Sequence, residues 1–184
     1  MNYTELSREI SYALRHAPQE YDLQLDAEGW TGTGELIMAL RKQERFLELT
    51  EADIADMIEA SEKKRHELSG GRIRALYGHS LPDRIKKECT RPPGVLYHGT
   101  AHKFLDRILN QGLISKDRQY VHLSQDWLTA LAVGKRRDDN PIVLGVDAAA
   151  AWTDGVKFYH GNEKIWLTDY IPAKYIRIES DKEY

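Results

Sequence analysis

The sequence has very little cysteine and no long apolar run. Its single cysteine, Cys89, cannot form an internal disulfide. We find neither an N-terminal apolar segment of the signal-peptide kind nor an apolar span of membrane-helix length. These absences argue against a disulfide-rich secreted domain, and we expect an intracellular, cytoplasmic protein with no membrane partner.

An excess of basic residues is missing as well. The chain has 26 Lys and Arg against 29 Asp and Glu, a net charge of −3, so binding to nucleic acid would require local clusters of cations. Hydrophobic residues make up 41% and charged residues 30%, which is typical of a folded globular protein. A chain of 184 residues has room for one large or two small domains.

Several common catalytic and metal-binding motifs are also lacking. There is no Walker A sequence or Gly-x-Ser-x-Gly elbow, and Gly32–Gly34 lacks the third glycine and the preceding strand of a dinucleotide fingerprint. His98 and His102 have a helical spacing, but a glycine lies between them, so we expect no bound metal. Cys89 is expected to be unreactive.

Apolar periodicity predicts three short helices in the first half of the chain. The first runs from about Tyr3 to His16 and is stopped by Pro18, and the second begins near Thr33. Thr50 and the aspartate three residues later form a capping box for the third.

A β-hairpin is predicted next, with strands over residues 65–68 and 72–77 around Ser69-Gly70-Gly71. Three helices followed by a β-ribbon is the winged-helix order, which is common among nucleic-acid-binding proteins but does not establish that function. Pro82 and Arg91-Pro92-Pro93-Gly94 then interrupt the pattern. We therefore expect two domains, residues 1–91 and 92–184.

The second half is expected to be a β-rich α+β lobe. Helical patterns occupy Lys103–Asn110, closed by Gly112, and Trp127–Val133. Short runs with strand character lie at Val95–Tyr97, Tyr120–Leu123, Ile142–Val146, Val156–Tyr159, Ile165–Thr168 and Ile176–Ile178.

Cationic clusters at the ends of predicted elements are the remaining candidates for a site: Arg15-His16, Lys63-Lys64-Arg65, Arg72 with Arg74, Arg118, and Lys135-Arg136-Arg137. Taken singly, each is best explained as a solvated surface. Arg15, for example, points away from the apolar stripe of its helix, and a cation in the last turn favours the helix dipole. Spacing alone does not make these residues a site.

Eight strings in sequence order change this interpretation, because together they resemble the RNA 2′-phosphotransferase family over nearly the whole chain. They are Leu14-Arg15-His16, Leu25-Asp26-x-x-Gly29-Trp30, Lys63-Lys64-Arg65, Ile73-Arg74-Ala75 with Gly78-His79-Ser80, Leu96-Tyr97-His98-Gly99-Thr100, Gly112-Leu113-Ile114, Arg118-x-Tyr120-Val121-His122-Leu123-Ser124 and Trp166-Leu167-Thr168. The resemblance implies an α+β fold with an N-terminal winged-helix-like RNA-binding lobe and a C-terminal ADP-ribosyltransferase-like NAD-binding lobe.

The resemblance also implies roles for individual residues. The catalytic set would be Arg15, His16, Arg65 and Arg118. Contacts to NAD would come from His79, Ser80, Tyr97, His98, Gly99, Thr100, Tyr120, His122, Ser124 and Ile165. Contacts to RNA would come from Lys63, Arg72 and Arg74.

Ile165 takes the place where the wider ADP-ribosyltransferase-like superfamily often has a glutamate. Glu163 lies two residues earlier and would occupy that place if the strand register were shifted. Without the resemblance, Tyr97 and Tyr120 would be interpreted as strand core and the strand histidines as satisfied polar groups.

The implied reaction consumes NAD in two steps. A phosphate oxygen of an internal RNA 2′-phosphate, in a tRNA-like substrate, attacks the nicotinamide ribose, and the 2″-hydroxyl of the resulting RNA 2′-phospho-ADP-ribose then attacks phosphorus. The products are 2′-hydroxyl RNA, nicotinamide and ADP-ribose 1″,2″-cyclic phosphate. The resemblance places this reaction in tRNA splicing. Arginines suit this phosphate because their planar donors pair with two oxygens, and His16 could move a proton.

Two other classes of function remain open at this stage. A winged-helix module without catalysis would explain the first half, and an enzyme that ADP-ribosylates proteins or nucleic-acid ends would explain the second. Release of nicotinamide, and its dependence on a 2′-phosphate, separates the three. We expect a monomer.

Overall fold

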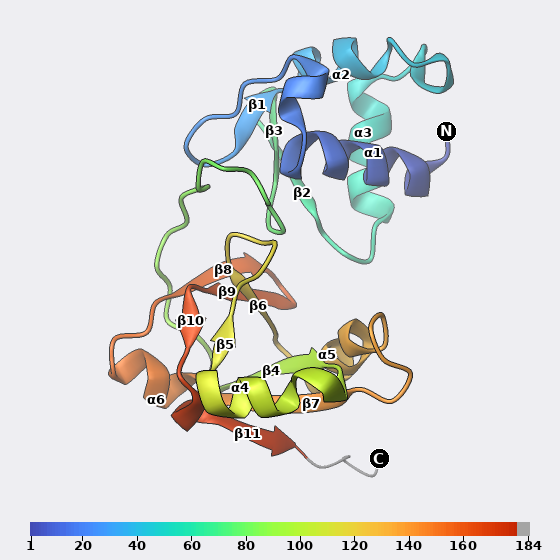
Figure 1. Ribbon diagram of the computed structural model, residues 1–184. Helices are drawn as coiled ribbons and strands as arrows, with labels where there is room; N and C mark the ends of the chain where they lie inside the picture. The colour runs from blue at the N-terminus through green and yellow to red at the C-terminus, as the bar shows by residue number, and fades with distance from the viewer. Residues whose placement is uncertain (180–184) are drawn as a thin grey trace. The chain divides into compact units, whose positions relative to one another are not determined.

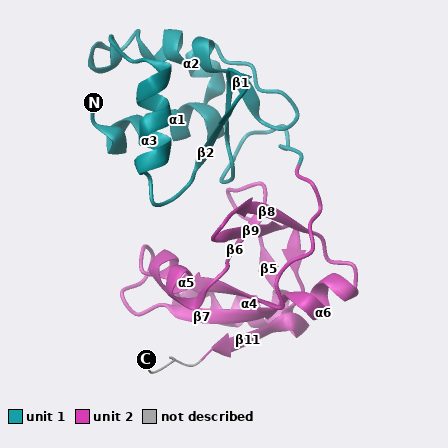
Figure 2. Ribbon diagram, turned by 180° about the vertical axis from the view of Figure 1, so that it is seen from behind, with its two compact units in different colours: residues 1–86 teal, residues 87–184 magenta. Residues whose placement is uncertain are grey.

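The computed structural model describes residues 1–179. The chain divides after Lys86 into two compact units, unit 1 (Met1–Lys86) and unit 2 (from Lys87 onward), which Figure 2 colours separately. Both units combine helices with antiparallel strands, which confirms the expected α+β class.

The three helices expected in unit 1 are present as α1 (Tyr3–Arg15), α2 (Thr33–Leu40) and α3 (Glu51–Ala60) (Figure 1). The capping box at the start of α3 is confirmed: Thr50 accepts from the amide of Asp53, whose carboxylate accepts from the amide of Thr50. Two 3-10 turns, η1 (Pro18–Tyr21) and η2 (Glu44–Phe46), lie between the helices.

The sheet of unit 1 has three antiparallel strands in the order β1-β3-β2. The hairpin of β2 (His66–Ser69) and β3 (Arg72–Ala75) confirms the prediction, and both glycines of its turn have positive φ, 56° and 72°. The strand β1 (Trp30–Gly32) was not expected. It adds to the free edge of β3, so the hairpin is held to the body of unit 1 on one side.

One core holds unit 1 together. The apolar stripe of α1 is fully buried and shares one core with side chains from α2, α3 and the β2–β3 hairpin, so the opposite face of α1 carries polar residues. The buried members of this core are Leu6, Ile10, Ala13, Leu14, Leu23, Leu36, Leu40, Phe46, Leu49, Ile54, Met57, Ile73 and Ala75.

The main sheet of unit 2 has six antiparallel strands in the order β11-β7-β4-β6-β9-β8. Their bounds are β4 (Val95–Thr100), β6 (Val121–Ser124), β7 (Ile142–Asp147), β8 (Phe158–Asn162), β9 (Ile165–Thr168) and β11 (Ile176–Glu179). A second, two-stranded sheet pairs β5 (Leu113–Ile114) with β10 (Tyr170–Ile171).

The strand expected at 156–159 was placed too early. Its first expected residue, Val156, instead donates its amide to the carbonyl of Ala151 and so closes the end of α6 (Ala148–Thr153), a helix that we did not expect. The strand β8 therefore begins only at Phe158.

Helices cover both faces of the main sheet. Leu96 belongs to the core that includes Ile108 of α4 (Leu105–Gln111), whereas its neighbour Tyr97 packs with Trp127 of α5 (Trp127–Gly134). Successive strand residues face opposite sides, so α4 and α5 lie on opposite faces. The predicted end of α4 at a glycine is confirmed: Gly112 has φ 82°.

The helix α5 lies directly on β4 at Gly99. A Cβ atom at this position would come within 1.9 Å of the carbonyl oxygen of Ala130 and 2.9 Å of the amide nitrogen of Gly134. Only a glycine allows this close approach. The contact fixes the strand that carries four of the residues predicted to bind NAD.

No helix within residues 1–179 combines the length and the apolar character needed to cross a membrane.

Candidate functional site

The C-terminal end of α1 carries a buried cation. Arg15 is only 8% exposed, and its Nη2 donates to the carbonyl oxygen of Arg65 at 3.3 Å. Its guanidinium also lies 5.1 Å from the centre of the Tyr77 ring, within cation–π range. These contacts from two later segments of unit 1 fix the direction of the guanidinium.

His16, the residue that caps α1, is held by the segment after β3. Its Nδ1 lies 2.7 Å from the hydroxyl of Ser80, and the amide of Ser80 donates to the carbonyl oxygen of Arg15 at 3.0 Å. His79 is buried, with 3% exposed. The structure thus brings Arg15 and His16, which come from one string of the sequence, into contact with Ser80, which comes from another.

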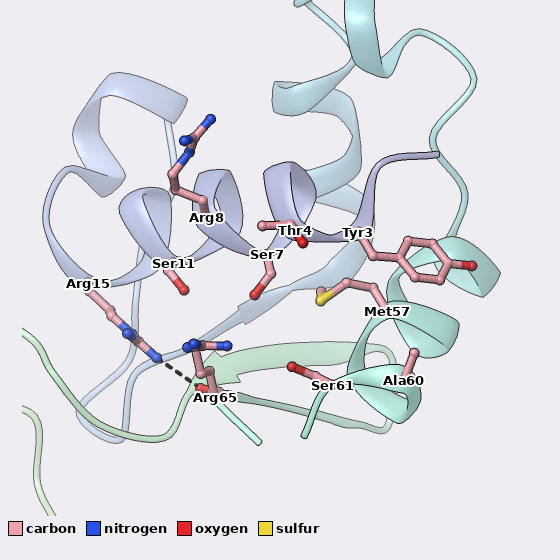
Figure 3. Close-up of a pocket in the computed structure, with 10 residues that line it drawn as sticks. All are labelled: Tyr3, Thr4, Ser7, Arg8, Ser11, Arg15, Met57, Ala60, Ser61 and Arg65. Atoms are coloured by element: carbon pink, nitrogen blue, oxygen red, sulfur yellow. Dashed lines mark hydrogen bonds between the residues drawn. The ribbon is translucent and has the colours of Figure 1, made fainter. Parts of the chain in front are cut away.

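A cleft of about 480 Å³ runs along the polar face of α1 (Figure 3). Its walls come from α1, from the end of α3 and from the segment before β2, and Arg15 and Arg65 both line it. Within residues 1–179, the guanidinium of Arg65 has no carboxylate partner. The full lining is Tyr3, Thr4, Ser7, Arg8, Ser11, Arg15, Met57, Ala60, Ser61 and Arg65.

A buried histidine lies behind this cleft. His66 is 4% exposed, and its Nε2 lies 3.0 Å from the hydroxyl of Ser11. Burial lowers the pKa of His66 to about 3, and the cations of Arg15 and Arg65 act in the same direction. The imidazole is therefore neutral at physiological pH and fixes a hydroxyl group beside the two guanidiniums.

The arginines of the hairpin are neutralised within unit 1. Arg72 forms an ion pair with Asp26, and Arg74 lies 2.7 Å from a carboxylate oxygen of Glu67 and 4.4 Å from the centre of the Trp30 ring. Lys63, the third residue predicted to contact RNA, is exposed. Any anion that bound Arg72 or Arg74 would have to compete with these carboxylates.

In unit 2, three residues predicted to bind NAD form a row across neighbouring strands. Tyr97 of β4 pairs with Ser124 of β6, and Ser124 pairs with Ile165 of β9. Directly paired residues of antiparallel strands project from the same face, so the three side chains share one surface. Ser124 is 4% exposed and is the buried polar group of the row.

The two strand histidines of unit 2 contact backbone carbonyls. Nδ1 of His98 lies 3.0 Å from the carbonyl oxygen of His122, and Nδ1 of His122 lies 3.0 Å from that of Tyr120. Burial lowers the pKa of His98, so its ring is neutral. The backbone thus satisfies one ring nitrogen of each histidine, and Thr100 of β4 is buried as well.

Arg118, the fourth predicted catalytic residue, lies between β5 and β6 in unit 2. Desolvation lowers the pKa of the Arg118 guanidinium and the nearby cation of Arg137 acts in the same direction, whereas the carboxylate of Asp117 raises it. Arginine remains charged despite such shifts. Glu163 lies in the exposed turn between β8 and β9, outside the row that contains Ile165.

Within the described residues, no group of three or more histidine, cysteine, aspartate or glutamate side chains could hold a metal ion. The positive charge at the candidate site is supplied by arginines.

Comparison with known proteins identifies the family. The family model described as "RNA 2'-phosphotransferase, Tpt1 / KptA family" matches residues 2–170. The chain belongs to this family. It is 56% identical to the "Probable RNA 2'-phosphotransferase" of Acetivibrio thermocellus (97% of this chain, 98% of the relative). Identity to the protein of that name from Bacillus thuringiensis subsp. konkukian is 52%, over 97% of each chain.

Membership of the RNA 2′-phosphotransferase family confirms the resemblance drawn from the eight strings and makes the chain a transferase. A nucleic-acid-binding module without catalysis, the first of the two alternatives, is therefore excluded.

Sequence reasoning missed two residues that line the cleft of unit 1 and one that lies behind it. Arg8 and Ser11 precede Arg15 by seven and four residues, spacings that place them on one side of a helix. The spacing is visible in the sequence, but it also fits a solvated helix face, so it did not single out Arg8 and Ser11. His66 gave no signal, because its burial depends on the packing of β2 behind α1.

Proposed function

We propose that this chain removes an internal 2′-phosphate from RNA by transferring it to the ADP-ribose part of NAD. In the first step, a phosphate oxygen attacks C1″ of the nicotinamide ribose, and the bond to nicotinamide breaks. In the second step, the 2″-hydroxyl attacks the phosphorus and the bond to the RNA 2′-oxygen breaks. That oxygen takes up a proton, and ADP-ribose 1″,2″-cyclic phosphate leaves.

The observation that carries this proposal is the meeting of Arg15 and Arg65 at one cleft. Two guanidiniums beside each other repel, and neighbouring cations lower the pKa of the histidine behind them. Arg65 has no carboxylate partner within residues 1–179. An anion with several oxygens, such as a phosphate monoester, would relieve this repulsion and accept planar pairs of hydrogen bonds.

The residues at the end of α1 also suit the two chemical steps. The phosphate is already an anion, so the first step needs positioning and no general base. In the second step, charge builds on the phosphoryl oxygens, and fixed guanidiniums stabilise it. His16, oriented by Ser80, is the residue proposed to move a proton. Arg118 is proposed to add a further cation.

For NAD, we propose the face of unit 2 that carries Tyr97, Ser124 and Ile165. An aromatic ring, a buried hydroxyl and an aliphatic side chain fit a ligand that combines flat rings with ribose hydroxyls. The family resemblance implies further contacts from Gly99, Tyr120 and His122 and, in unit 1, from His79 and Ser80. It also implies His98 and Thr100, which alternate with Tyr97 along β4, so their side chains lie on the other face of the sheet. Ile165 in place of a glutamate agrees with a first step that needs no general base.

The domain assignments are proposals of the same kind. Three helices followed by a β-hairpin support a winged-helix-like lobe for residues 1–91. The antiparallel sheet of unit 2 supports an ADP-ribosyltransferase-like lobe for residues 92–184. We further propose a monomeric cytoplasmic enzyme that acts on tRNA-like RNA.

The direct test uses an oligonucleotide with one internal 2′-phosphate, incubated with the protein in the presence and absence of NAD. We expect loss of the 2′-phosphate only with NAD, and equal amounts of nicotinamide and ADP-ribose 1″,2″-cyclic phosphate. Release of inorganic phosphate would indicate a phosphatase and overturn the proposal. Nicotinamide release without a 2′-phosphate would favour ADP-ribosylation of another acceptor.

A variant separates the two steps. Replacing Lys63 and Arg65 with glutamine should slow the second step more than the first, because only the second builds negative charge on the phosphoryl oxygens. A gel of end-labelled RNA at saturating NAD should then show ADP-ribosylated RNA. The matched control is Lys42→Gln with Arg107→Gln, two exposed cations outside the cleft. A uniformly slowed reaction without an intermediate band would refute this role.

A further inference from the structure

The cleft of unit 1 extends well beyond the two arginines proposed to hold the 2′-phosphate. Arg8 lines it seven residues before Arg15, which is two turns or about 10 Å along α1. Figure 3 shows the side chain of Arg15 directed toward Arg65 and that of Arg8 directed away from it. One phosphate group at Arg15 and Arg65 therefore leaves Arg8 unused.

The charge of Arg8 is available for a ligand. Its side chain is exposed, and within residues 1–179 it forms neither an ion pair nor a hydrogen bond with a carboxylate. Arg72 and Arg74 differ in this respect, because each is paired with an acidic residue of unit 1. An incoming phosphate would pair with Arg8 without first displacing a carboxylate.

Hydroxyl groups connect the two cationic ends of the cleft. Thr4, Ser7 and Ser11 lie on the side of α1 that lines it, and Ser61 lies at the end of α3. Ser11 is fixed by its 3.0 Å contact with His66. When the imidazole proton is on Nε2, Ser11 accepts this bond and keeps its own hydroxyl proton for a phosphate oxygen.

We propose that this cleft binds the RNA strand next to the 2′-phosphate, with Arg8 pairing with a neighbouring backbone phosphate and Ser11 donating a hydrogen bond between Arg8 and Arg15. The inference rests on the proposed function and adds a substrate preference to it. An RNA that continues along the cleft is bound more tightly than one that ends at the 2′-phosphate.

The lining of the cleft indicates contacts to the backbone of the RNA and not to its bases. Tyr3 is its only aromatic residue, and the other non-cationic residues are hydroxyl-bearing or small, apart from Met57. Recognition of single-stranded bases normally uses several aromatic platforms. Binding in the cleft should therefore depend strongly on salt and little on sequence.

The test crosses two proteins with two substrates. Wild-type and Arg8→Ala proteins are assayed with an oligonucleotide that carries an internal 2′-phosphate and with a minimal mononucleotide 2′-phosphate. We expect Arg8→Ala to raise KM about tenfold for the oligonucleotide, the value of one charged hydrogen bond, and to leave the minimal substrate unchanged. Ser11→Ala should act in the same direction. The control Lys42→Ala removes an exposed cation outside the cleft.

A binding measurement needs no turnover. The affinity for an oligonucleotide without a 2′-phosphate is measured by fluorescence anisotropy over a range of salt concentrations. The slope of log K against log salt should fall by about 0.7 in Arg8→Ala, the loss of one phosphate contact on a single strand. Arg72→Ala and Arg74→Ala should change it less.

The outcomes separate the two proposals. If wild-type protein acts on both substrates but Arg8→Ala changes both equally, or neither, the subsite is refuted while the proposed function stands. If wild-type protein leaves both 2′-phosphates in place, the proposed function fails and the subsite fails with it.

Discussion

Acidification should destabilise unit 1 through His66. The imidazole is buried and neutral in the folded protein, with a pKa lowered to about 3, whereas it titrates near the ordinary value of 6.5 in the unfolded chain. Between these values the unfolded state binds a proton that the folded state does not. The stabilisation is therefore complete above pH 6.5 and is lost as the pH falls toward 3.

The size of the effect follows from the distance between the two pKa values. A pH of 5.0 is about 1.5 units below the pKa of the imidazole in the unfolded chain, and each unit corresponds to about 1.4 kcal/mol. The free energy of unfolding should therefore be about 2 kcal/mol lower at pH 5.0 than at pH 7.5. His98 of unit 2 also has a pKa lowered by burial. Comparison with His66→Gln cancels its contribution.

The assay is urea unfolding of the wild-type protein and His66→Gln at pH 7.5 and 5.0, with unit 1 followed by pulse proteolysis and identification of its fragments. His66→Gln is expected to be less stable at pH 7.5, because the new side chain must fill the buried site beside Ser11. Its stability should fall by about 2 kcal/mol less on acidification. If acidification lowers the free energy of unfolding equally in both proteins, the conclusion that His66 is buried and neutral behind the cleft is refuted.

Three further predictions concern the site and its support. Arg118→Ala should lower kcat by about 10²–10³ at unchanged thermal stability. A near-wild-type rate would show that Arg118 is a solvated surface residue without a catalytic role. Glu163→Ala should retain most 2′-phosphotransfer because Glu163 lies in an exposed turn, and abolished turnover in a folded variant would refute the place given to Ile165. Gly99→Ala should destabilise the protein by about 1–3 kcal/mol in thermal unfolding, because its Cβ would meet the carbonyl of Ala130; an unchanged Tm would refute that contact.

Local signals in the sequence predicted most of the fold. The capping box at Thr50, the two glycines of the β2–β3 turn and Gly112 at the end of α4 act through neighbouring atoms, so their effect can be read from short strings. Elements that depend on distant partners were missed. The strand β1 has three residues and exists because β3, some forty residues later, pairs with it.

The candidate site divides in the same way. Arg15, His16 and Arg65 were recognised from the family resemblance, and spacing alone would have left them as surface cations. The partners that fix them, the carbonyl of Arg65 and the hydroxyl of Ser80, come from segments 50 and 64 residues away. No periodicity reports such contacts. The role proposed for Arg8 depends on the cleft, which shows which face of α1 remains open.

Ser80 contacts the C-terminal end of α1 through two chemically separate bonds. Its amide satisfies the carbonyl of Arg15 at the end of α1, and its hydroxyl contacts the imidazole of His16. Any residue with a backbone amide preserves the first bond, whereas only a short polar side chain preserves the second. In a mutational scan, position 80 should therefore tolerate alanine in assays of protein abundance and reject it in assays of activity, which is the signature of a residue under selection for chemistry.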